Sequence, residues 1–494
     1  MINIGAEDYN VLKQQYIKKY IRLELLDFQY SIVDELSGNM TKCSINVDSN
    51  SDLRRSCDLG FVVTTSTFDI KAGSKLWLDK FCRPYVGYEN MRTGEVQWYN
   101  QGIYLVNNPQ WSYNASTNEI SMQALDLMSK LTGLRNGNLE GIPTKIAKDE
   151  NVREAIISTL ALGGFTKYIC EECKTKDGTI VPVPYDIEID VGGTVYDILT
   201  GLRDIMPNYQ IYFDVNGIFH YEPIPLAYDD PVLIDDDLFN NVLISENINT
   251  DFESVKNYVE VLGHTWDVDY YSPSDKTTVS GNTITPTFTD LKELQNDTAI
   301  GITLPSDVSS ADKIIIKFLG DNDVLDINNE PIKKLSKDEE WIFQYVVQTE
   351  GEGESATTTK FWRFMGHQQA QATSYDNNPS SPFYVGNPIG SSSVGRIRIV
   401  LYGGEYDNIY SDDLAKQRAD FEIYQRSRLN DSISMETIPI PWMDANIVVS
   451  HRFGQKQEPS KYIAKSFSVD YATGGTMTIN AITWYSYYEE SEVV

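Results

Sequence analysis

The chain has 494 residues, of which 41 % are hydrophobic and 12 % aromatic, so it is long enough for three or four domains and too hydrophobic to be disordered. Its 71 acidic and 41 basic residues give a net charge of -30, which disfavours nucleic-acid binding along the chain as a whole. Residues 1–20 lack the features of a signal peptide, and no stretch reaches the roughly 18 apolar residues of a membrane helix, so cytoplasmic synthesis without membrane insertion is expected.

The first region is predicted to be rich in β-strands. Helical spacing of apolar residues predicts a short helix at about 8–19. Alternating apolar and polar residues then predict strands at 21–25 and 43–47. The pattern continues at 77–81, 102–106 and 120–125, and the β-rich region ends near Leu134.

A mixed α+β stretch follows. Asn151 can cap a helix at 151–162 that stops at a Gly-Gly pair. A second helix begins after Gly193, carries an apolar stripe and ends at Pro207. A hairpin at 210–221 is expected to turn at Val215-Asn216-Gly217, where Asn-Gly supplies the positive φ angles of a tight turn.

The amino-acid composition changes after the acidic run Asp235–Asp237. A strand at 257–263 leads into about 130 residues whose connections are dominated by Ser, Thr, Asp, Asn, Gly and Pro. Strands are expected at 313–318, 341–348 and 360–364, and 374–393 is nearly all turn-forming residues. We interpret this part as an inserted β domain tethered by a polar loop.

The last hundred residues return to a regular pattern. A strand at 396–401 precedes a helix at 411–429, which Ser411 can cap. A strand at 445–450 and a hairpin at 461–485, turning at 472–475, complete the chain.

The five cysteines are an odd number without framework spacing, which indicates reduced thiols. Cys170-Glu-Glu-Cys173 is a single CxxC, whereas a structural zinc site needs two further N or S ligands. Incidental thiols are the favoured interpretation, and the alternatives are a zinc site completed elsewhere or across a symmetric interface, and a redox pair.

Other motifs point to turns. Gly351-Glu-Gly353-Glu-Ser-Ala356 matches GxGxxA, but the β-branched and aromatic residues after it favour a hairpin turn. The carboxylates from Asp321 to Glu330 depart from the EF-hand pattern, so a solvated turn is expected there, as it is for Asp235–Asp237.

No catalytic, cofactor-binding or metal-binding residue is predicted. The four histidines, His220, His264, His367 and His451, lie in separate segments and are interpreted as structural. No nucleophile elbow or Walker A loop occurs. Because a glycosidase needs only two carboxylates, a wall-degrading glycosidase stays open as a minor alternative.

Several segments, in their order along the chain, resemble the tail hub or baseplate hub proteins of phages infecting Gram-positive bacteria and of related injection machines. The resemblance covers most of the chain apart from 265–394. The segments that carry it are Arg54-Arg55 within 49–57, 98–106, 122–128, 195–206 with 209–221, 255–263, 418–429, Val469-Asp470-Tyr471 and 477–481.

The resemblance implies a mainly β chain with α+β parts. It implies two tube-like β-barrel domains, at 1–135 and at 231–265 with 395–494, the latter carrying helix 411–429 on its outside. A small α/β domain at 136–230 and an inserted, peripheral β domain at 266–394 complete the expected organisation.

The function implied is that of a structural, non-enzymatic hub of the virion tail tip or baseplate, synthesised in the host bacterial cytoplasm. Three copies are expected to form a ring that continues the tail tube and connects it to the distal tail, tape measure and spike or tip proteins for DNA delivery. The acidic charge would suit a channel wall past which DNA slides without sticking. The alternative is a tail protein that binds host cell-wall carbohydrate, with Trp341, Trp362, Tyr375 and Tyr384 in the insertion as candidate contacts.

Overall fold

In a computed structural model, the chain folds into two compact units. The first unit comprises residues 1–255 with 428–492, and the second comprises 256–427. The residues described are 6–37, 40–63, 69–139, 144–174, 178, 180–183, 187–189, 191–206, 209–225, 232–265, 269–326, 329–350, 357–386, 394–409, 412–454, 458–472 and 474–484. No helix in these ranges is long and apolar enough to cross a bilayer.

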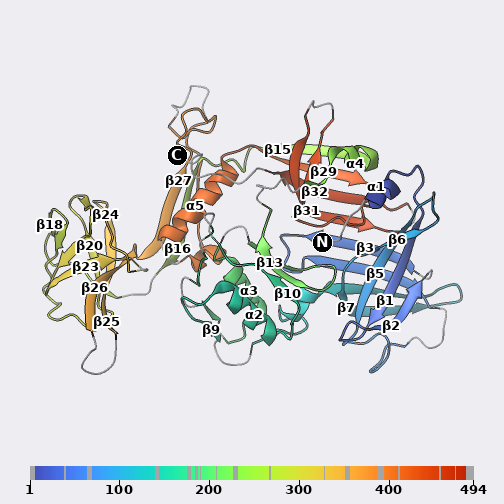
Figure 1. Cartoon of the computed structure of the whole chain (residues 1–494), viewed down its shortest axis with the longest axis horizontal. Helices are drawn as coiled ribbons and strands as arrows, with labels where there is room; N and C mark the ends of the chain where they lie inside the picture. Colours follow the sequence, from blue (N-terminus) through green and yellow to red (C-terminus); the bar gives the residue numbers. More distant parts are fainter. Residues whose placement is uncertain are drawn as a thin grey trace. The chain divides into compact units, whose positions relative to one another are not determined.

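The first unit is built on one fourteen-stranded sheet (Figure 1). Its main path runs β15-β29-β32-β31-β3-β4-β8-β7-β5-β1-β2, with β6 beside β5, β30 beside β31 and β14 beside β30. The strands are β1 (Lys19–Leu26), β2 (Ile32–Ser37), β3 (Met40–Asp48), β4 (Arg55–Val62), β5 (Phe81–Glu89), β6 (Val96–Asn100), β7 (Tyr104–Tyr113), β8 (Asn118–Asp126), β14 (Val232–Ile234), β15 (Leu243–Asp251), β29 (Asn430–Thr437), β30 (Val448–His451), β31 (Ser460–Asp470) and β32 (Met477–Thr483).

One hydrophobic core serves the whole sheet. Alternate residues of each strand are buried, such as Cys43, Ile45 and Val47 of β3 and Phe467 and Val469 of β31, because successive side chains of a strand point to opposite faces. Helices α1 (Ala6–Leu12) and α4 (Asp236–Val242) lie beside each other and contribute apolar residues to the same core. The chain is therefore mainly β, as expected.

The two expected barrels are not seen as separate bodies. Strands from 40–126 and from 243–483 belong to the same sheet and share its core, and neither set closes into a barrel in the part of the chain that the structure describes. The physical reason is that β31 pairs with β3, so hydrogen bonding continues from one region into the other.

The α+β part of the first unit contains α2 (Val152–Leu162), α3 (Val195–Arg203), and strands β9 (Thr144–Ile146), β10 (Tyr168–Cys170), β11 (Ile187–Ile189), β12 (Tyr209–Phe213) and β13 (Phe219–Pro223). Asn151 caps α2 as predicted, and Thr194 with Asp197 forms a capping box on α3. The β12–β13 hairpin also forms, but only Gly217 has a positive φ, of 74°. Its turn comprises Val215, Asn216 and Gly217, as predicted, since the Asp214 N–H bonds to the Ile218 carbonyl on the other side of these residues.

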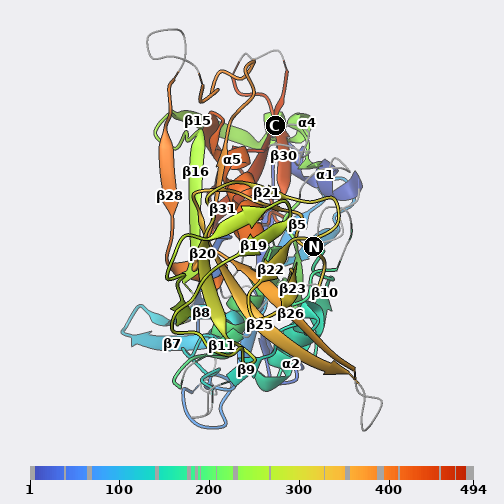
Figure 2. The same cartoon turned by 90° about the vertical axis from the view of Figure 1, so that its left-hand side faces the viewer.

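The second unit has two cores. A three-stranded sheet of β16 (Tyr258–Thr265), β27 (Gln369–Tyr375) and β28 (Arg398–Leu401) packs against α5 (Asp412–Arg426). An eight-stranded sheet, in which β25 and β26 form the long pair (Figure 2), encloses the other core. Its strands are β17 (Tyr270–Tyr271), β18 (Thr278–Ser280), β19 (Thr283–Thr285), β20 (Ala299–Thr303), β22 (Ile315–Lys317), β23 (Asp321–Leu325), β25 (Glu340–Glu350) and β26 (Thr357–Gly366), with the small pair β21 (Val308–Ser309) and β24 (Lys334–Leu335) beside them.

The two units are a coarser division than the four expected domains, whose borders at 135, 230, 265 and 394 stay a prediction. The helix expected at 411–429 spans 412–426 and packs on β16 and β27 in the second unit. Its proposed cap, Ser411, lies outside the described residues. The stretch 77–81, predicted as a strand, consists of turns and bends up to the start of β5.

Candidate assembly site

Eight strands of the large sheet form two blocks with the same connectivity. In the first block, β3-β4-β8-β7, two hairpins lie side by side with their second strands, β4 and β8, paired. In the second block, β15-β29-β32-β31, the hairpins β15–β29 and β31–β32 again pair through their second strands. Eight of the fourteen strands thus form a tandem repeat of one four-stranded unit.

The two blocks meet where β31 pairs antiparallel with β3. The register runs from Ser44 opposite Asp470 to Asp48 opposite Ser466. Backbone hydrogen bonds of 2.9 Å bound the junction, from the Tyr471 N–H to the Cys43 carbonyl and from the Ser49 N–H to the Lys465 carbonyl. The last strand of one block therefore pairs with the first strand of the next.

The sheet face opposite the core is polar across both blocks, and we call it the polar face. One row of register partners is polar across six strands and then meets Leu125 of β8; its polar members are Ser245, Glu436, Thr478, Ser468, Asn46 and Ser56. The neighbouring rows are also mainly polar: Asn247, Ser434, Asn480, Ser466 and Asp48; Asp470, Ser44, Asp58, Gln123 and Asn107; and Lys42, Gly60, Ser121 and Gln110.

The charges of the polar face are mostly negative. Asp48, Asp58, Glu436 and Asp470 lie in these rows, and among the described residues in them Lys42 is the basic one, 3.2 Å from Asp58. A surface of this kind repels phosphate and offers few cations for an ion pair.

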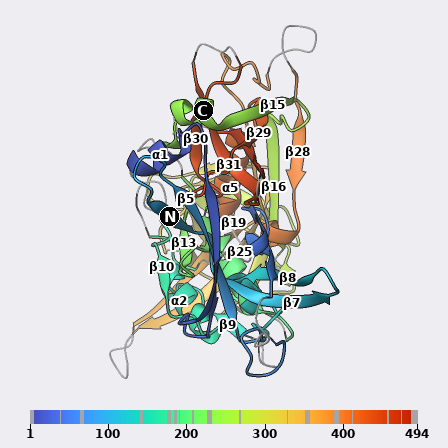
Figure 3. The same cartoon turned by 90° about the vertical axis from the view of Figure 1, so that its right-hand side faces the viewer.

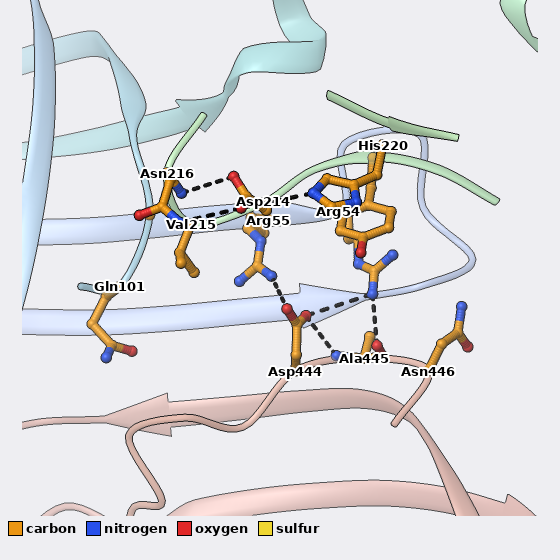
Figure 4. Close-up of polar contacts among 12 residues, drawn as sticks. Arg54, Arg55, Gln101, Asp214, Val215, Asn216, His220, Asp444, Ala445 and Asn446 are labelled. Carbon is orange, nitrogen blue, oxygen red and sulfur yellow. Dashed lines mark hydrogen bonds and ion pairs between the residues drawn. The ribbon is translucent and has the colours of Figure 1, made fainter. Parts of the chain in front are cut away.

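Behind the junction, two buried arginines share one carboxylate (Figure 4). Arg55 Nη2 lies 2.5 Å from Asp444 Oδ2, and Arg54 Nη2 lies 3.5 Å from Asp444 Oδ1. Arg54 also donates to the Ala445 carbonyl at 2.6 Å and to Gln210 Oε1 at 2.9 Å. The cluster therefore links the first block, the β12–β13 hairpin and the segment before β30.

The charged groups of Arg54, Arg55 and Asp444 depend on one another electrostatically. Burial opposes charge on Asp444, but Arg55 and Arg54 outweigh it and hold the pKa of the Asp444 carboxyl below its usual value. Burial lowers the pKa of the Arg54 guanidinium, and burial with nearby Arg54 lowers the pKa of Lys465 to about 8. One carboxylate thus supports two guanidinium groups that water reaches poorly.

The segment before β30 also contacts α1, β5, β6 and the residues just before β7. The Tyr88 hydroxyl donates to the Pro439 carbonyl at 2.7 Å, and the Gln101 amide donates to the Pro441 carbonyl at 2.9 Å. Trp442, 2 % exposed, packs its ring on those of Tyr9 and Tyr99. The junction is consequently fixed from the core side as well as through the strands.

Three of the four histidines lie between two carboxylates. His220 lies 2.9 Å from Glu222 and 3.7 Å from Asp214, His367 contacts Glu339 and Asp412, and buried His451 contacts Asp236 and Glu246. Burial disfavours the charged form of His220, but the hydrogen bonds to Asp214 and Glu222 outweigh it and raise its pKa to about 9. The His220 contacts lie within the β12–β13 hairpin, whereas those of His367 and His451 each join separate segments within their own unit.

Cys170 is the last residue of β10, and Cys173 lies just beyond this strand. Burial raises the pKa of Cys170 to about 12 and that of Cys173 to about 11, which is unfavourable for thiolate chemistry. Within the described residues, no group of three or more His, Cys, Asp or Glu side chains could hold a metal ion.

The remaining motifs considered from the sequence lie in different parts of the fold. Asp235 caps α4 by accepting from the Leu238 N–H at 2.9 Å, so the acidic run begins a helix and is not a simple turn. Asp321 begins β23, and Asp326 accepts from the Glu330 N–H in the loop that follows. The Gly351–Ala356 motif lies outside the described residues.

Two of the four aromatic residues proposed for carbohydrate contact are buried, and Tyr384 is half-buried. Trp341 is 8 % exposed and Trp362 is fully buried, and both belong to the core of the eight-stranded sheet. Tyr375 is 45 % exposed and stacks on Tyr258. The tryptophans were wrongly taken as surface contacts, because an alternating strand pattern does not tell which face of a sheet is covered.

The two outer strands of the tandem repeat have unpaired edges. Among the described strands, β15 pairs with β29 alone, and β7 pairs with β5 only at Tyr104 and Leu105. The rest of β7 extends with β8 as a hairpin (Figure 3), on which Trp111 is 41 % and Tyr113 80 % exposed. Sequence reasoning missed both edges, since nothing local marks a strand as the last of a sheet.

Comparisons with known proteins give one family model and several solved structures of similar fold. A domain of unknown function, DUF5048, matches residues 381–488, and no curated protein matches the sequence. The 43 kDa tail protein of prophage MuSo2 from Shewanella oneidensis is similar in structure, with a TM-score of 0.48, 10 % identity and coverage of 96 % of this chain and 100 % of that one. A tail protein from Neisseria meningitidis gives 0.47, 8 %, 95 % and 98 %, and the prophage tail protein gp18 from Listeria monocytogenes gives 0.40, 8 %, 96 % and 97 %.

Proposed function

We propose that the chain is a structural hub subunit of a phage-type tail tip or baseplate. Three copies form a ring that continues the tail tube and connects it to the tape measure and the spike or tip proteins for DNA delivery. The subunit acts by assembly and has no catalytic role of its own.

The tandem repeat is the observation that carries this proposal. Each chain supplies two four-stranded blocks joined head to tail, so three chains supply six similar blocks. Three subunits can thereby match a sixfold tube, because a heterologous contact repeated around an axis closes into a ring when its rotation fits. A single block per chain would not offer this match at threefold symmetry.

The polar face supports the same role. If it lines the channel, DNA meets Ser, Thr, Asn and Gln side chains with a few carboxylates, and Lys42 is already paired with Asp58. The resulting repulsion of phosphate keeps DNA from binding to the wall during passage.

Sedimentation of the purified chain, alone and with its tail partners, tests the proposal. We expect an assembly of three times the 56.0 kDa chain mass at high protein concentration or with a partner present. A chain that stays monomeric under all of these conditions contradicts the proposed function.

A further inference from the structure

The second unit consists of two parts with separate cores. We call the eight-stranded sheet with its β21–β24 pair, residues 270–366, the β lobe, and we call β16, β27, β28 and α5 the helix lobe. The chain leaves the helix lobe after Thr265 and returns to it after Gly366. Because the apolar cores are separate, the side-chain contacts at these connections bear directly on how the lobes are held together.

His367 connects the two lobes through both nitrogens of its ring. Its Nδ1 lies 2.8 Å from Asp412 Oδ2 at the start of α5, and its Nε2 lies 3.1 Å from Glu339 Oε2, just before β25. The ring also packs on the indole of Trp341 in β25, with the ring centroids 4.4 Å apart. One side chain therefore contacts a carboxylate of each lobe, and we call this pair of contacts the His367 bridge.

Backbone groups fix the helix-lobe side of the bridge. Asp412 accepts from the His367 N–H at 3.2 Å and from the Gln371 N–H at 2.8 Å. Gly366 has a φ of 79°, and a Cβ at this residue would lie 2.5 Å from Asp412 Oδ2, so the turn requires glycine. His367 thus stays attached to α5 through bonds that need no imidazole proton, whereas its hydrogen bond to the β lobe uses the ring alone.

Both ring contacts can be hydrogen bonds at the same time only when the imidazole is charged. A neutral imidazole has one N–H and one acceptor nitrogen, and an ionised carboxylate only accepts. After loss of the proton, one ring nitrogen therefore presents a lone pair to a carboxylate. The side chain of Glu339 is 45 % exposed and that of Asp412 22 %, so water replaces the contact to Glu339 more easily.

We propose that the His367 bridge is a pH-sensitive contact that sets the orientation of the β lobe on the helix lobe. With the imidazolium present, both carboxylates are bound and the β lobe is held in place. When the proton leaves, the bond to Glu339 opens and the β lobe turns about Gly366. The inference concerns the second unit alone and does not depend on the proposed ring.

The electrostatic surroundings of the ring set the direction of the pH dependence. Burial opposes charge on His367, but the hydrogen bonds to Asp412 and Glu339 outweigh it and raise its pKa above the usual 6.5. The bridge is therefore closed below pH 6.5, and it opens as the pH rises through the higher pKa of the folded chain.

The neighbouring charged groups are engaged in other contacts. Among the described side chains within four residues of Glu339, His367 or Asp412, the other charged ones are Lys337 and Asp338, which pair with each other, Glu340, which bonds to Tyr270, Arg363, which lies over Phe361, and Lys416, which pairs with Asp420. The two bridging carboxylates thus determine the response of the ring.

Distance measurements between two spin labels on the full-length chain test the inference. Ser280→Cys places one label on β18 of the β lobe, and Gln417→Cys places the other on α5, both at exposed positions. A Cys170→Ser background avoids labelling of the half-buried native cysteine, and the other four are buried. We expect a narrow distance distribution at pH 6 and a shifted or broader one at pH 10, with a midpoint above pH 6.5. Identical distributions at both pH values overturn the proposal.

Glu339→Gln is the variant that tests the proton directly. A glutamine amide can accept from the charged ring and donate to the neutral one, so the bond to Nε2 no longer needs the proton. The change in distance between pH 6 and 10 should be lost in this variant. His220→Gln is the matched control, since it removes a histidine between two carboxylates in the first unit, and it should keep the full change. A full change in Glu339→Gln, or its loss in His220→Gln, overturns the proposal.

Discussion

At the residue scale, the most consequential group is the cluster of Arg54, Arg55 and Asp444. The sequence singles out the two arginines, but it does not indicate their partner, because Asp444 lies 389 residues after Arg55. Burial of all three could not be expected from composition, since arginines are usually exposed unless paired. The pairing depends on the approach of two distant segments.

Replacing Asp444 with Asn is expected to destabilise the first unit strongly. Two buried guanidinium groups would lose their counter-charge, and breaking a buried pair in this way typically costs about 3–5 kcal/mol. Chemical denaturation followed by tryptophan fluorescence measures the change. Asp58→Asn, which removes a half-exposed partner of Lys42, is the control and should cost about 1 kcal/mol or less. Equal effects of the two changes would contradict the role given to the cluster.

The His220 contacts predict a pH dependence of stability. The pKa of His220 is about 9 in the folded chain, whereas its usual value is 6.5. The stabilisation that the charged imidazolium provides is therefore fully present below about pH 6.5 and is lost as the pH rises through about 9. Melting temperatures of the native chain and of His220→Gln, measured from pH 6 to 10, should differ at pH 6 and converge at pH 10. A constant difference would show that the imidazolium contacts contribute nothing.

At the element scale, alternation and capping signals predict much of the secondary structure. The strands at 21–25, 43–47 and 120–125 and the helix at 151–162 follow from side-chain period and an Asn cap. The strand predicted at 77–81 does not form, because most of these residues lie in turns and bends. Turns have no side-chain period that a sequence pattern could reveal. Local sequence patterns also cannot predict the order of strands in a sheet. For example, β15 and β29 are neighbours although 178 residues separate Asp251 from Asn430.

The β15–β29 pairing predicts that the second unit can be removed. Asp251 and Asn430 are register partners at the ends of their strands, so the intervening residues occupy the loop of a hairpin. Replacing 252–429 with a short Asn-Gly turn should leave the first unit folded, because a tight turn spans this distance. Circular dichroism and a cooperative unfolding transition measure the result.

The excised unit provides the complementary measurement. Residues 256–427 contain two cores of their own and should fold as an isolated chain. A first unit that unfolds on replacement of the loop, while the isolated second unit folds, would show that the β15–β29 hairpin depends on contacts beyond its own strands.

At the scale of the whole molecule, the tandem repeat could not be derived from local patterns. One block uses strands between 40 and 126, whereas the other uses strands on both sides of the second unit, from 243–251 and 430–483. The resemblance led to the expectation of two similar domains, and the sheet provides a physical link between two such blocks through β3 and β31. In the described residues the strands of the two expected domains belong to one sheet, because the pairing of β31 with β3 joins them.

A three-dimensional image of the assembled chain by electron cryo-microscopy tests the central claim most directly. We predict a threefold ring with six similar four-stranded blocks around one channel, and with the polar face, including Ser468, Asn46 and Ser56, toward the channel. A ring with that face turned outward, or an assembly without threefold symmetry, would contradict the account.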